Sequence, residues 1–249
     1  MITAYHRPKT LDEALTLLTQ EDMVPLGGGT LLSHNKTDSV QAVDLQLLGL
    51  NSLTKTGNNL ELGGTLTLQA LLESEHCPAA LKAALKLEAP LNIRNSATVA
   101  GTLVACDGRS TFASMLLAMD TKIEQAKFTD AKIEYQTTNI GDFIPLRPTE
   151  LITKIIIPLN VKLAFEYVSK TPSDKPLVCA SMAQWNSGRT RLALGGYGVS
   201  PMLAMDGTES EGAAAAAKNT FHEATDEYAS AEYRMDVAST LAKRCLESL

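Results

Sequence analysis

Apolar residues recur at helical spacing near both ends of the sequence. The first helical stretch follows Pro8, where Thr10 and Glu13 stand three residues apart, the spacing of a capping box. Its apolar positions, which share one face of a helix, are Leu11, Ala14, Leu15, Leu17 and Leu18. The last stretch repeats this spacing and predicts a terminal amphipathic helix that packs on a core. Its apolar positions are Ala231, Met235, Ala238, Leu241, Ala242 and Cys245.

Shorter apolar runs between these helices, bounded by glycine and proline, indicate strands. Strands are predicted over 23–26, 40–45, 60–63, 150–158, 163–167, 178–185 and 191–194. The alternation over 122–136 indicates a hairpin that turns near Thr129 and Asp130. The glycine cluster over 195–198 is interpreted as a turn at a strand end.

Further short helices are predicted after Thr67, from Pro78, over 112–118 and over 213–217. Residues 91–108 are polar and punctuated by glycine, so we predict a loop there. Helices and strands do not alternate regularly, which favours an α+β fold. A second unit is expected to begin near Asn160.

Composition narrows the possible functions. The chain has 249 residues and a formal charge of -6, with lysine and arginine scattered. Nucleic-acid binding needs a basic patch, so we expect no nucleic-acid partner. No run approaches the ~20 apolar residues that span a bilayer, and the first residues lack the pattern of a secretory signal, so we expect no membrane span and a cytoplasmic protein. The four cysteines and four histidines show no metal-site spacing, so we predict free buried thiols and no metal.

The first segment that indicates binding chemistry runs from Leu26 through Gly27, Gly28, Gly29 and Thr30 to Leu31. Consecutive glycines permit positive φ and let a backbone approach another group closely. Successive amides in such a turn can form a nest for a diphosphate. A plain tight turn remains the alternative, because the segment lacks the GxGxxG pattern.

The second such segment runs from Arg94 to Arg109, with small and hydroxyl residues from 96 to 102. It can wrap a ligand and donate hydrogen bonds from Thr98, Thr102 and several amides. Asp107 can accept a hydrogen bond from a ribose or ribityl hydroxyl, and the two arginines can pair with phosphate or with carboxylates. A buried crossover loop remains the alternative.

Several motifs in a fixed order resemble the FAD-binding medium subunit of the molybdenum hydroxylases, the family of xanthine dehydrogenase and carbon monoxide dehydrogenase. Residues 26–32 resemble the first FAD loop of that family, and residues 93–102 resemble the second. The other matching segments, which run almost from end to end, are 5–14 as an opening helix, 43–45, 62–67, 116–120, 150–158, 191–196 and 229–234. The sequence departs from the usual motifs at Thr30, Ala100 and Thr102, and at Thr111.

The resemblance implies a two-lobed FAD-binding domain of the vanillyl-alcohol-oxidase (PCMH) type over 1–159, with lobes of about 1–55 and 56–159, followed by a small α+β domain over 160–249. It also implies FAD as the cofactor. By the match, Leu26 to Leu31 hold the diphosphate, Ile152 forms an apolar wall, and five residues complete the pocket. These five are Thr98, Val99, Ala100, Gly101 and Thr102.

The function that the resemblance implies is electron transfer within a complex. A molybdopterin-binding large subunit and a [2Fe-2S] small subunit are the implied partners, and NAD or a quinone is an implied acceptor. The flavin supplies the redox chemistry, so we predict no catalytic side chain in this chain. A flavin-free structural or assembly subunit that retains the fold is the alternative.

Overall fold

The structure, a computed structural model, describes residues 1–32, 39–129 and 132–249. Each of its two compact units is assembled from three separate stretches of the chain. Unit 1 contains Met1–Glu73, Leu91–Ala105 and Lys122–Ile156, and unit 2 contains Ser74–Pro90, Cys106–Thr121 and Ile157–Leu249. The division into domains over 1–159 and 160–249 stays a prediction.

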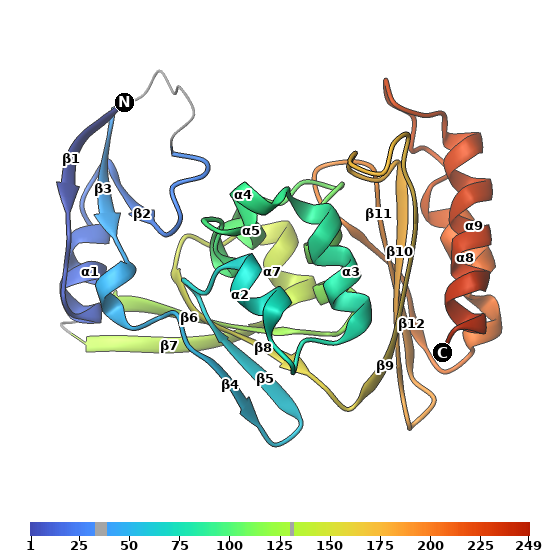
Figure 1. Cartoon of the computed structure of the whole chain (residues 1–249), viewed down its shortest axis with the longest axis horizontal. Coiled ribbons are helices and arrows are strands. Elements are labelled where there is room, and N and C mark those ends of the chain that lie inside the picture. Colours follow the sequence, from blue (N-terminus) through green and yellow to red (C-terminus); the bar gives the residue numbers. More distant parts are fainter. Residues whose placement is uncertain (33–38, 130–131) are drawn as a thin grey trace. The chain divides into compact units, whose positions relative to one another are not determined.

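Unit 1 contains a small parallel sheet in the order β1-β3-β2 (Figure 1). Its strands are β1 (Ile2–His6), β2 (Met23–Leu26) and β3 (Val40–Asp44). Helix α1 (Leu11–Leu18) packs on one face, where Ala14 and Leu15 share a core with Val43. The Thr10 hydroxyl accepts a hydrogen bond from the Glu13 amide at 3.3 Å, so the predicted N-cap is confirmed.

A five-stranded sheet in the order β4-β5-β8-β6-β7 completes the strands of unit 1. Its strands are β4 (Leu53–Thr56), β5 (Asn59–Gly63), β6 (Lys122–Thr129), β7 (Lys132–Asn139) and β8 (Leu151–Pro158), whose last two residues belong to unit 2. The helical segments are η1 (Gln46–Leu48), α2 (Leu68–Glu73), α4 (Leu91–Arg94), α5 (Val99–Val104) and α7 (Ile140–Leu146). The side chain of Thr67 accepts a hydrogen bond from Ala70 and caps α2 as predicted.

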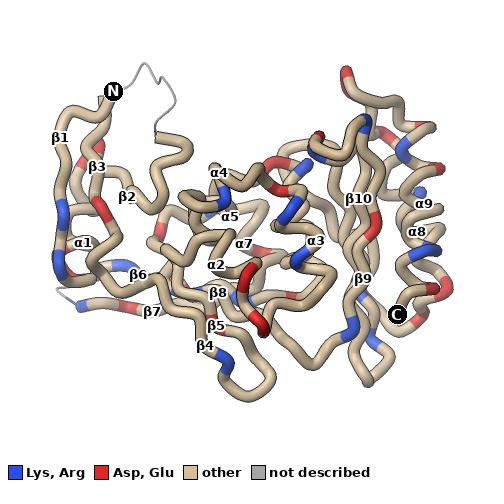
Figure 2. Tube along the Cα trace, viewed as in Figure 1, with Lys and Arg blue, Asp and Glu red and all other residues tan. Residues whose placement is uncertain are grey.

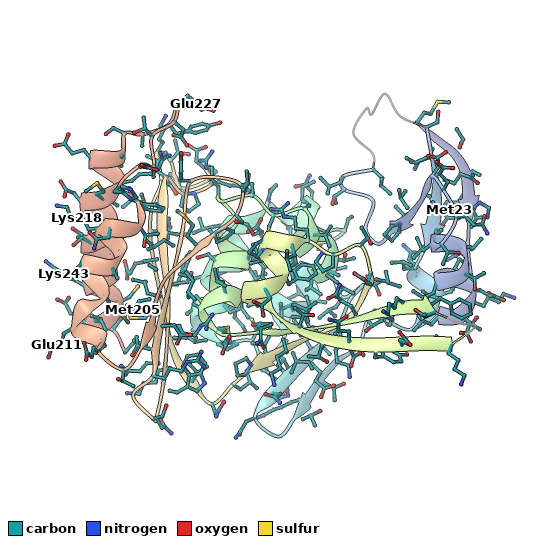
Figure 3. All side chains as sticks on the ribbon, turned by 180° about the vertical axis from the view of Figure 1, so that it is seen from behind. Met23, Met205, Glu211, Lys218, Glu227 and Lys243 are labelled. Atoms are coloured by element: carbon teal, nitrogen blue, oxygen red, sulfur yellow. The ribbon has the colours of Figure 1, made fainter. Side chains whose placement is uncertain are left out.

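Unit 2 is built on an antiparallel sheet in the order β12-β11-β10-β9. Its strands are β9 (Val161–Val168), β10 (Val178–Trp185), β11 (Thr190–Gly195) and β12 (Met202–Gly207). Segment η2 (Ser210–Gly212) precedes α8 (Ala213–Thr220), which packs on the sheet together with α9 (Ala231–Glu247). Helices α3 (Ala79–Glu88) and α6 (Thr111–Ala118) also contact its strands. The exposed Lys218 and Lys243 point away from the sheet (Figure 3).

Alternation along β10 explains how its two faces differ. Val178, Ala180 and Met182 belong to the core shared with α8 and α9. On the other face, the Ser181 hydroxyl lies 3.0 Å from that of Ser114 on α6. Both faces of this strand are therefore covered, in agreement with its continuous burial.

Most of the predicted elements are confirmed, including the mixed α+β class, the fully buried helix at 112–118 and the terminal helix. The hairpin over 122–136 is confirmed by the pairing of β6 with β7, but Asp130 lies outside the described residues. The turn after β11 is also confirmed, with Gly196 at a φ of 124° and Gly198 at 81°.

Two predictions were wrong. Residues 91–108 are not one loop, because α4 and α5 lie within them. The stretch over 5–14 does not begin as a helix, because Tyr5 and His6 belong to β1 and pair with β3. Four elements lacked a predictive pattern, namely β1, β4, α7 and β12. Pro145 lies inside α7, and Arg147, the residue that follows the helix, has a φ of 43°.

Charged residues of both signs are interspersed along the described chain (Figure 2). All four cysteines are buried and free, as predicted. Burial raises the pKa of Cys77, Cys179 and Cys245 to about 12, so these thiols stay protonated at neutral pH. Within the described ranges, no group of three or more metal-ligating side chains occurs, and no helix is long and apolar enough to cross a membrane.

Candidate functional site

The first glycine loop begins where strand β2 ends. Leu26 still belongs to the sheet, since its carbonyl oxygen accepts a hydrogen bond from the Leu45 amide at 3.0 Å. Gly29 has a φ of 69°, a conformation that glycine adopts without strain. No residue within 1–32, 39–129 or 132–249 accepts a hydrogen bond from the backbone N–H of Gly27 or Gly28. The loop therefore presents two successive amide donors to a ligand.

The first loop lies directly against the second segment. A Cβ atom on Gly28 would lie 1.7 Å from the carbonyl oxygen of Ser96. A Cβ atom on Gly27 would lie 2.9 Å from the Thr98 hydroxyl oxygen. Glycine is thus required at Gly28, because the close neighbour is backbone that no side-chain rotation can move. The structure brings together two segments that are far apart in the sequence.

The second segment uses its own amides to build helix α5. The Thr98 hydroxyl accepts a hydrogen bond from the Gly101 amide at 3.1 Å, and the Thr98 carbonyl accepts from Thr102 at 2.9 Å. The Val99 and Ala100 amides donate to the carbonyl oxygens of Leu66 and Gly64 at 2.8 and 3.2 Å. The expectation that several amides of this segment are available to a ligand was wrong for residues 99–102. Their assignment as pocket residues stays a prediction.

Gly64 lies close to two of the predicted pocket residues, Ile152 and Ala100. A Cβ atom at Gly64 would lie 2.3 Å from the Ile152 carbonyl oxygen and 3.5 Å from the Ala100 Cβ atom. The Gly64 amide donates to the Thr153 carbonyl at 2.9 Å, which fixes the loop after β5 to strand β8. Sequence analysis did not select Gly64 as a site residue. The paired Gly63 and Gly64 at a strand end were the signal that could have identified it.

Asp107 and Arg109 lie in unit 2, where both already have partners. Asp107 Oδ1 accepts a hydrogen bond from the Arg109 amide at 3.0 Å and lies 3.6 Å from Lys175 Nζ. The Arg109 guanidinium donates to the carbonyl oxygens of Lys175 and Pro176, at 2.7 and 3.3 Å, and lies over the Tyr228 ring. A contact between Asp107 and a ribose or ribityl hydroxyl stays a prediction.

Arg94 lies in unit 1, on the same side of the chain division as both loops. Its Nε atom donates to Gln69 Oε1 at 3.0 Å. This contact is with an amide, so the pairing of Arg94 with a phosphate or with a carboxylate stays a prediction.

The arrangement of the first loop fits an anionic group with several oxygens. Backbone amides keep their dipoles at every accessible pH, so the loop can bind an anion without a titrating group. A diphosphate matches this donor set because it has an oxygen for each amide. Helix α5, fixed by bonds to Leu66 and Gly64, provides rigid packing against which the loop is held.

Comparison with known proteins agrees with these features. The family model described as the FAD binding domain in molybdopterin dehydrogenase matches residues 1–160. The uncharacterized protein YgfM of Escherichia coli K12 is 29% identical over 201 residues, which cover 79% of this chain and 75% of the relative. The carbon monoxide dehydrogenase medium chain of Afipia carboxidovorans is 27% identical over 276 residues, which cover 98% and 95%.

Two solved structures show the same fold. The Cu,Mo-CO dehydrogenase in its cyanide-inactivated form has a chain with a TM-score of 0.82 and 23% identity, covering 100% of this chain and 97% of that one. A chain of quinoline 2-oxidoreductase from Pseudomonas putida 86 has a TM-score of 0.81 and 19% identity, covering 98% and 96%. Because the family model matches well over half of the chain, this protein belongs to the family of FAD binding domains in molybdopterin dehydrogenases.

Proposed function

We propose that this chain is the electron-relaying flavoprotein subunit of a multi-subunit molybdopterin-dependent hydroxylase. One observation carries the proposal: the amides of Gly27 and Gly28, which have no acceptor among the described residues, precede the left-handed Gly29 on a loop packed against Ser96 and Thr98. FAD, when bound, supplies the redox chemistry, because its ring can accept and release electrons. The chain itself binds and orients the cofactor.

The proposed roles of the residues come from the family resemblance, and the contacts described above support them. Leu26 to Leu31 hold the diphosphate, with the Gly27 and Gly28 amides as donors. The segment from Thr98 to Thr102 completes the pocket by shape and with the Thr102 hydroxyl, because its amides are occupied within the chain. Ile152, which is buried and lies against Gly64, closes the pocket with an apolar side chain. No side chain acts as an acid or a base.

The partners follow from what the relatives are. A carbon monoxide dehydrogenase medium chain, a chain of Cu,Mo-CO dehydrogenase and a chain of quinoline 2-oxidoreductase match nearly the whole sequence. We infer a molybdopterin-binding large subunit and a [2Fe-2S] small subunit as partners, with NAD, a quinone or another acceptor taking the electrons. In support, none of the four cysteines lies in the closely spaced pattern that an iron–sulfur cluster requires.

Purification of the tagged full chain from its own cells tests both parts of the proposal. We expect visible flavin absorbance in a fixed ratio to the chain, together with co-purifying chains that contain molybdenum and iron. Reduction by the substrate of the molybdenum partner should bleach the flavin bands. Co-purifying chains without flavin would instead show a structural subunit, and a flavin-containing chain without partners would contradict the assignment to a complex.

A further inference from the structure

The three parallel strands of unit 1 end at the same edge of their sheet, beside the first glycine loop. Leu26 pairs with Asp44, and His6 pairs with Val43, so Arg7 follows β1 at the level of Asp44. Ligands of parallel sheets commonly bind at the carboxyl ends of the strands. Arg7 brings a permanent positive charge to this edge.

Asp44 fixes the position of the Arg7 side chain. The Asp44 side chain is 1% exposed, and its Oδ2 atom lies 3.3 Å from Arg7 Nε. The same oxygen accepts a hydrogen bond from the Tyr5 hydroxyl, and Oδ1 accepts from the Gln46 amide at 3.0 Å. This hydrogen bond to Asp44 raises the pKa of the Tyr5 phenol, so Tyr5 stays a neutral donor. The buried carboxylate is thus held by two hydrogen-bond donors, and the ion pair places the Arg7 guanidinium beside it.

The contact between Arg7 and Asp44 is an ion pair in which Nε makes the closest approach. An arginine that serves a carboxylate alone commonly binds it with two parallel N–H groups. Here Nε makes the contact, and no described residue accepts from Nη1 or Nη2. The Arg7 side chain is 50% exposed, so these donors remain open to a ligand.

Tyr5, Asp44 and Leu26, the residue before the glycine loop, lie on the same face of the small sheet. Tyr5 and Asp44 contact each other, so their side chains share one face, and the alternation of strand residues places Leu26 there as well. Helix α1 covers the other face through Val43. Neighbouring strands are about 4.8 Å apart, so a guanidinium over the end of β3 lies one strand from the Gly27 amide.

We propose that Arg7, positioned by Asp44, binds a phosphate group of the flavin dinucleotide. This inference rests on the proposed function and adds a cationic donor to the neutral amides of the first loop. The chemistry is a charge-assisted hydrogen bond from Nη1 or Nη2 to a phosphate oxygen. It makes the site selective for flavins that carry phosphate, because riboflavin offers Arg7 no anion.

Titration of the full chain with FAD and with riboflavin, followed by flavin fluorescence, tests the inference. We expect Arg7→Met to raise the Kd for FAD about tenfold or more, because a hydrogen bond to a charged group is lost. The Kd for riboflavin should stay unchanged. Arg7→Lys should recover part of the affinity, since it keeps the charge but lacks the fork. Added salt should weaken FAD binding less in Arg7→Met than in the parent chain.

Lys9→Met is the matched control, because it removes one positive charge two residues away and leaves Asp44 and its partners in place. Equal FAD affinity in Arg7→Met and Lys9→Met would overturn the inference. An equal loss of riboflavin and FAD affinity in Arg7→Met would overturn it too, since Arg7 would then act only on the fold. If Arg7→Met does not fold, the comparison of Arg7→Lys with Lys9→Met decides in the same way. Failure of the parent chain to bind FAD would overturn the proposed function itself.

Discussion

The two predicted FAD loops of unit 1 use their backbone in opposite ways. In the first loop, the Gly27 and Gly28 amides have no acceptor among the described residues. In the second, the amides of residues 99–102 all donate within the chain, two of them to the carbonyl oxygens of Leu66 and Gly64. One loop therefore has donors to offer a ligand, and the other has used its donors to become rigid.

This difference assigns separate tasks to two segments that looked alike in the sequence. A loop with free amides can stabilise an anion, but it must be held in place to do so. The helix α5 segment holds it, because the Ser96 carbonyl and the Thr98 side chain fill the space that side chains on the first loop would need. Substitutions in the first loop should thus change ligand affinity, whereas those in the second should first change stability.

Gly28→Val should produce the largest effect. Its Cβ atom would lie 1.7 Å from the Ser96 carbonyl oxygen, so the two loops must separate. We expect FAD binding to fall below detection, and the free energy of unfolding to decrease by about 3 kcal/mol. Fluorescence titration with FAD and denaturant unfolding measure the two effects.

A matched control for Gly28→Val is Gly207→Ala, where a Cβ atom would have no neighbour within 4 Å. This control should bind FAD like the parent chain. Labelling of the buried cysteines separates loss of the ligand from loss of the fold, because these thiols react only after unfolding. Undiminished FAD binding by Gly28→Val would show that the first loop is not the diphosphate site.

Gly64→Ala should have the next largest effect. It acts on the second segment, because the Gly64 carbonyl oxygen accepts the hydrogen bond from the Ala100 amide. The new Cβ atom would lie 2.3 Å from the Ile152 carbonyl oxygen, which pushes strand β8 away from the loop after β5. We expect a loss of about 2 kcal/mol in stability and a several-fold rise in the Kd for FAD. The same assays apply. A change in affinity without any change in stability would contradict the structural role of Gly64.

Local features of the sequence predicted their elements well. The N-cap of α1 involves only Thr10 and Glu13, and the terminal helix follows from its apolar spacing alone. Elements that depend on distant partners were missed. Helix α5 contains glycine and β-branched residues, which disfavour helices, and its first amides bond to carbonyl groups more than thirty residues earlier. Strand β1 is largely exposed and exists because it pairs with β3.

The candidate site could be predicted only in part for the same reason. The glycines of the first loop were visible, since a run of three glycines is a local signal. The contact of Gly28 with Ser96 was not visible, because it joins residues of separate segments. The sequence also could not show that the Ala100 amide donates a hydrogen bond to the Gly64 carbonyl oxygen. Nor could it show that Arg7 forms an ion pair with the buried Asp44.

Asp206→Asn in unit 2 should lower stability without changing the affinity for FAD. This variant tests whether a loss of stability alone raises the Kd for FAD, as a substitution in the first loop is expected to do. Arg189 binds both oxygens of Asp206 at 2.7 Å, and this contact lowers the pKa of the carboxyl group. Since the pKa in the folded state is below the unfolded value of about 3.9, the charged group stabilises the fold above that pH. Its contribution is lost as the pH falls through the folded-state pKa.

We expect Asp206→Asn to cost about 1–2 kcal/mol at pH 7. The difference from the parent chain should shrink as the pH falls below about 3.9, where the carboxyl group of the unfolded parent chain takes up a proton, and should vanish below the folded-state pKa. Urea unfolding at both pH values measures this. A rise in the Kd for FAD would show that the assay responds to stability in general, and the loop comparison would then need variants of matched stability.

The smallest predicted effect is a coupling between the two loops. Gly27→Ala places a Cβ atom 2.9 Å from the Thr98 hydroxyl oxygen and 3.2 Å from its methyl carbon, whereas the Thr98 Cβ atom is at 3.7 Å, an ordinary contact. Thr98→Ala alone removes the cap of α5 and should cost about 1 kcal/mol in stability. It also removes both Thr98 atoms that would lie closest to a Cβ atom at position 27.

Gly27→Ala should therefore cost less in the Thr98→Ala background than in the parent chain, by about 1 kcal/mol in a double-mutant cycle of unfolding free energies. Additive costs would mean that the loops do not press on each other, and that the first loop is held in place by some other part of unit 1.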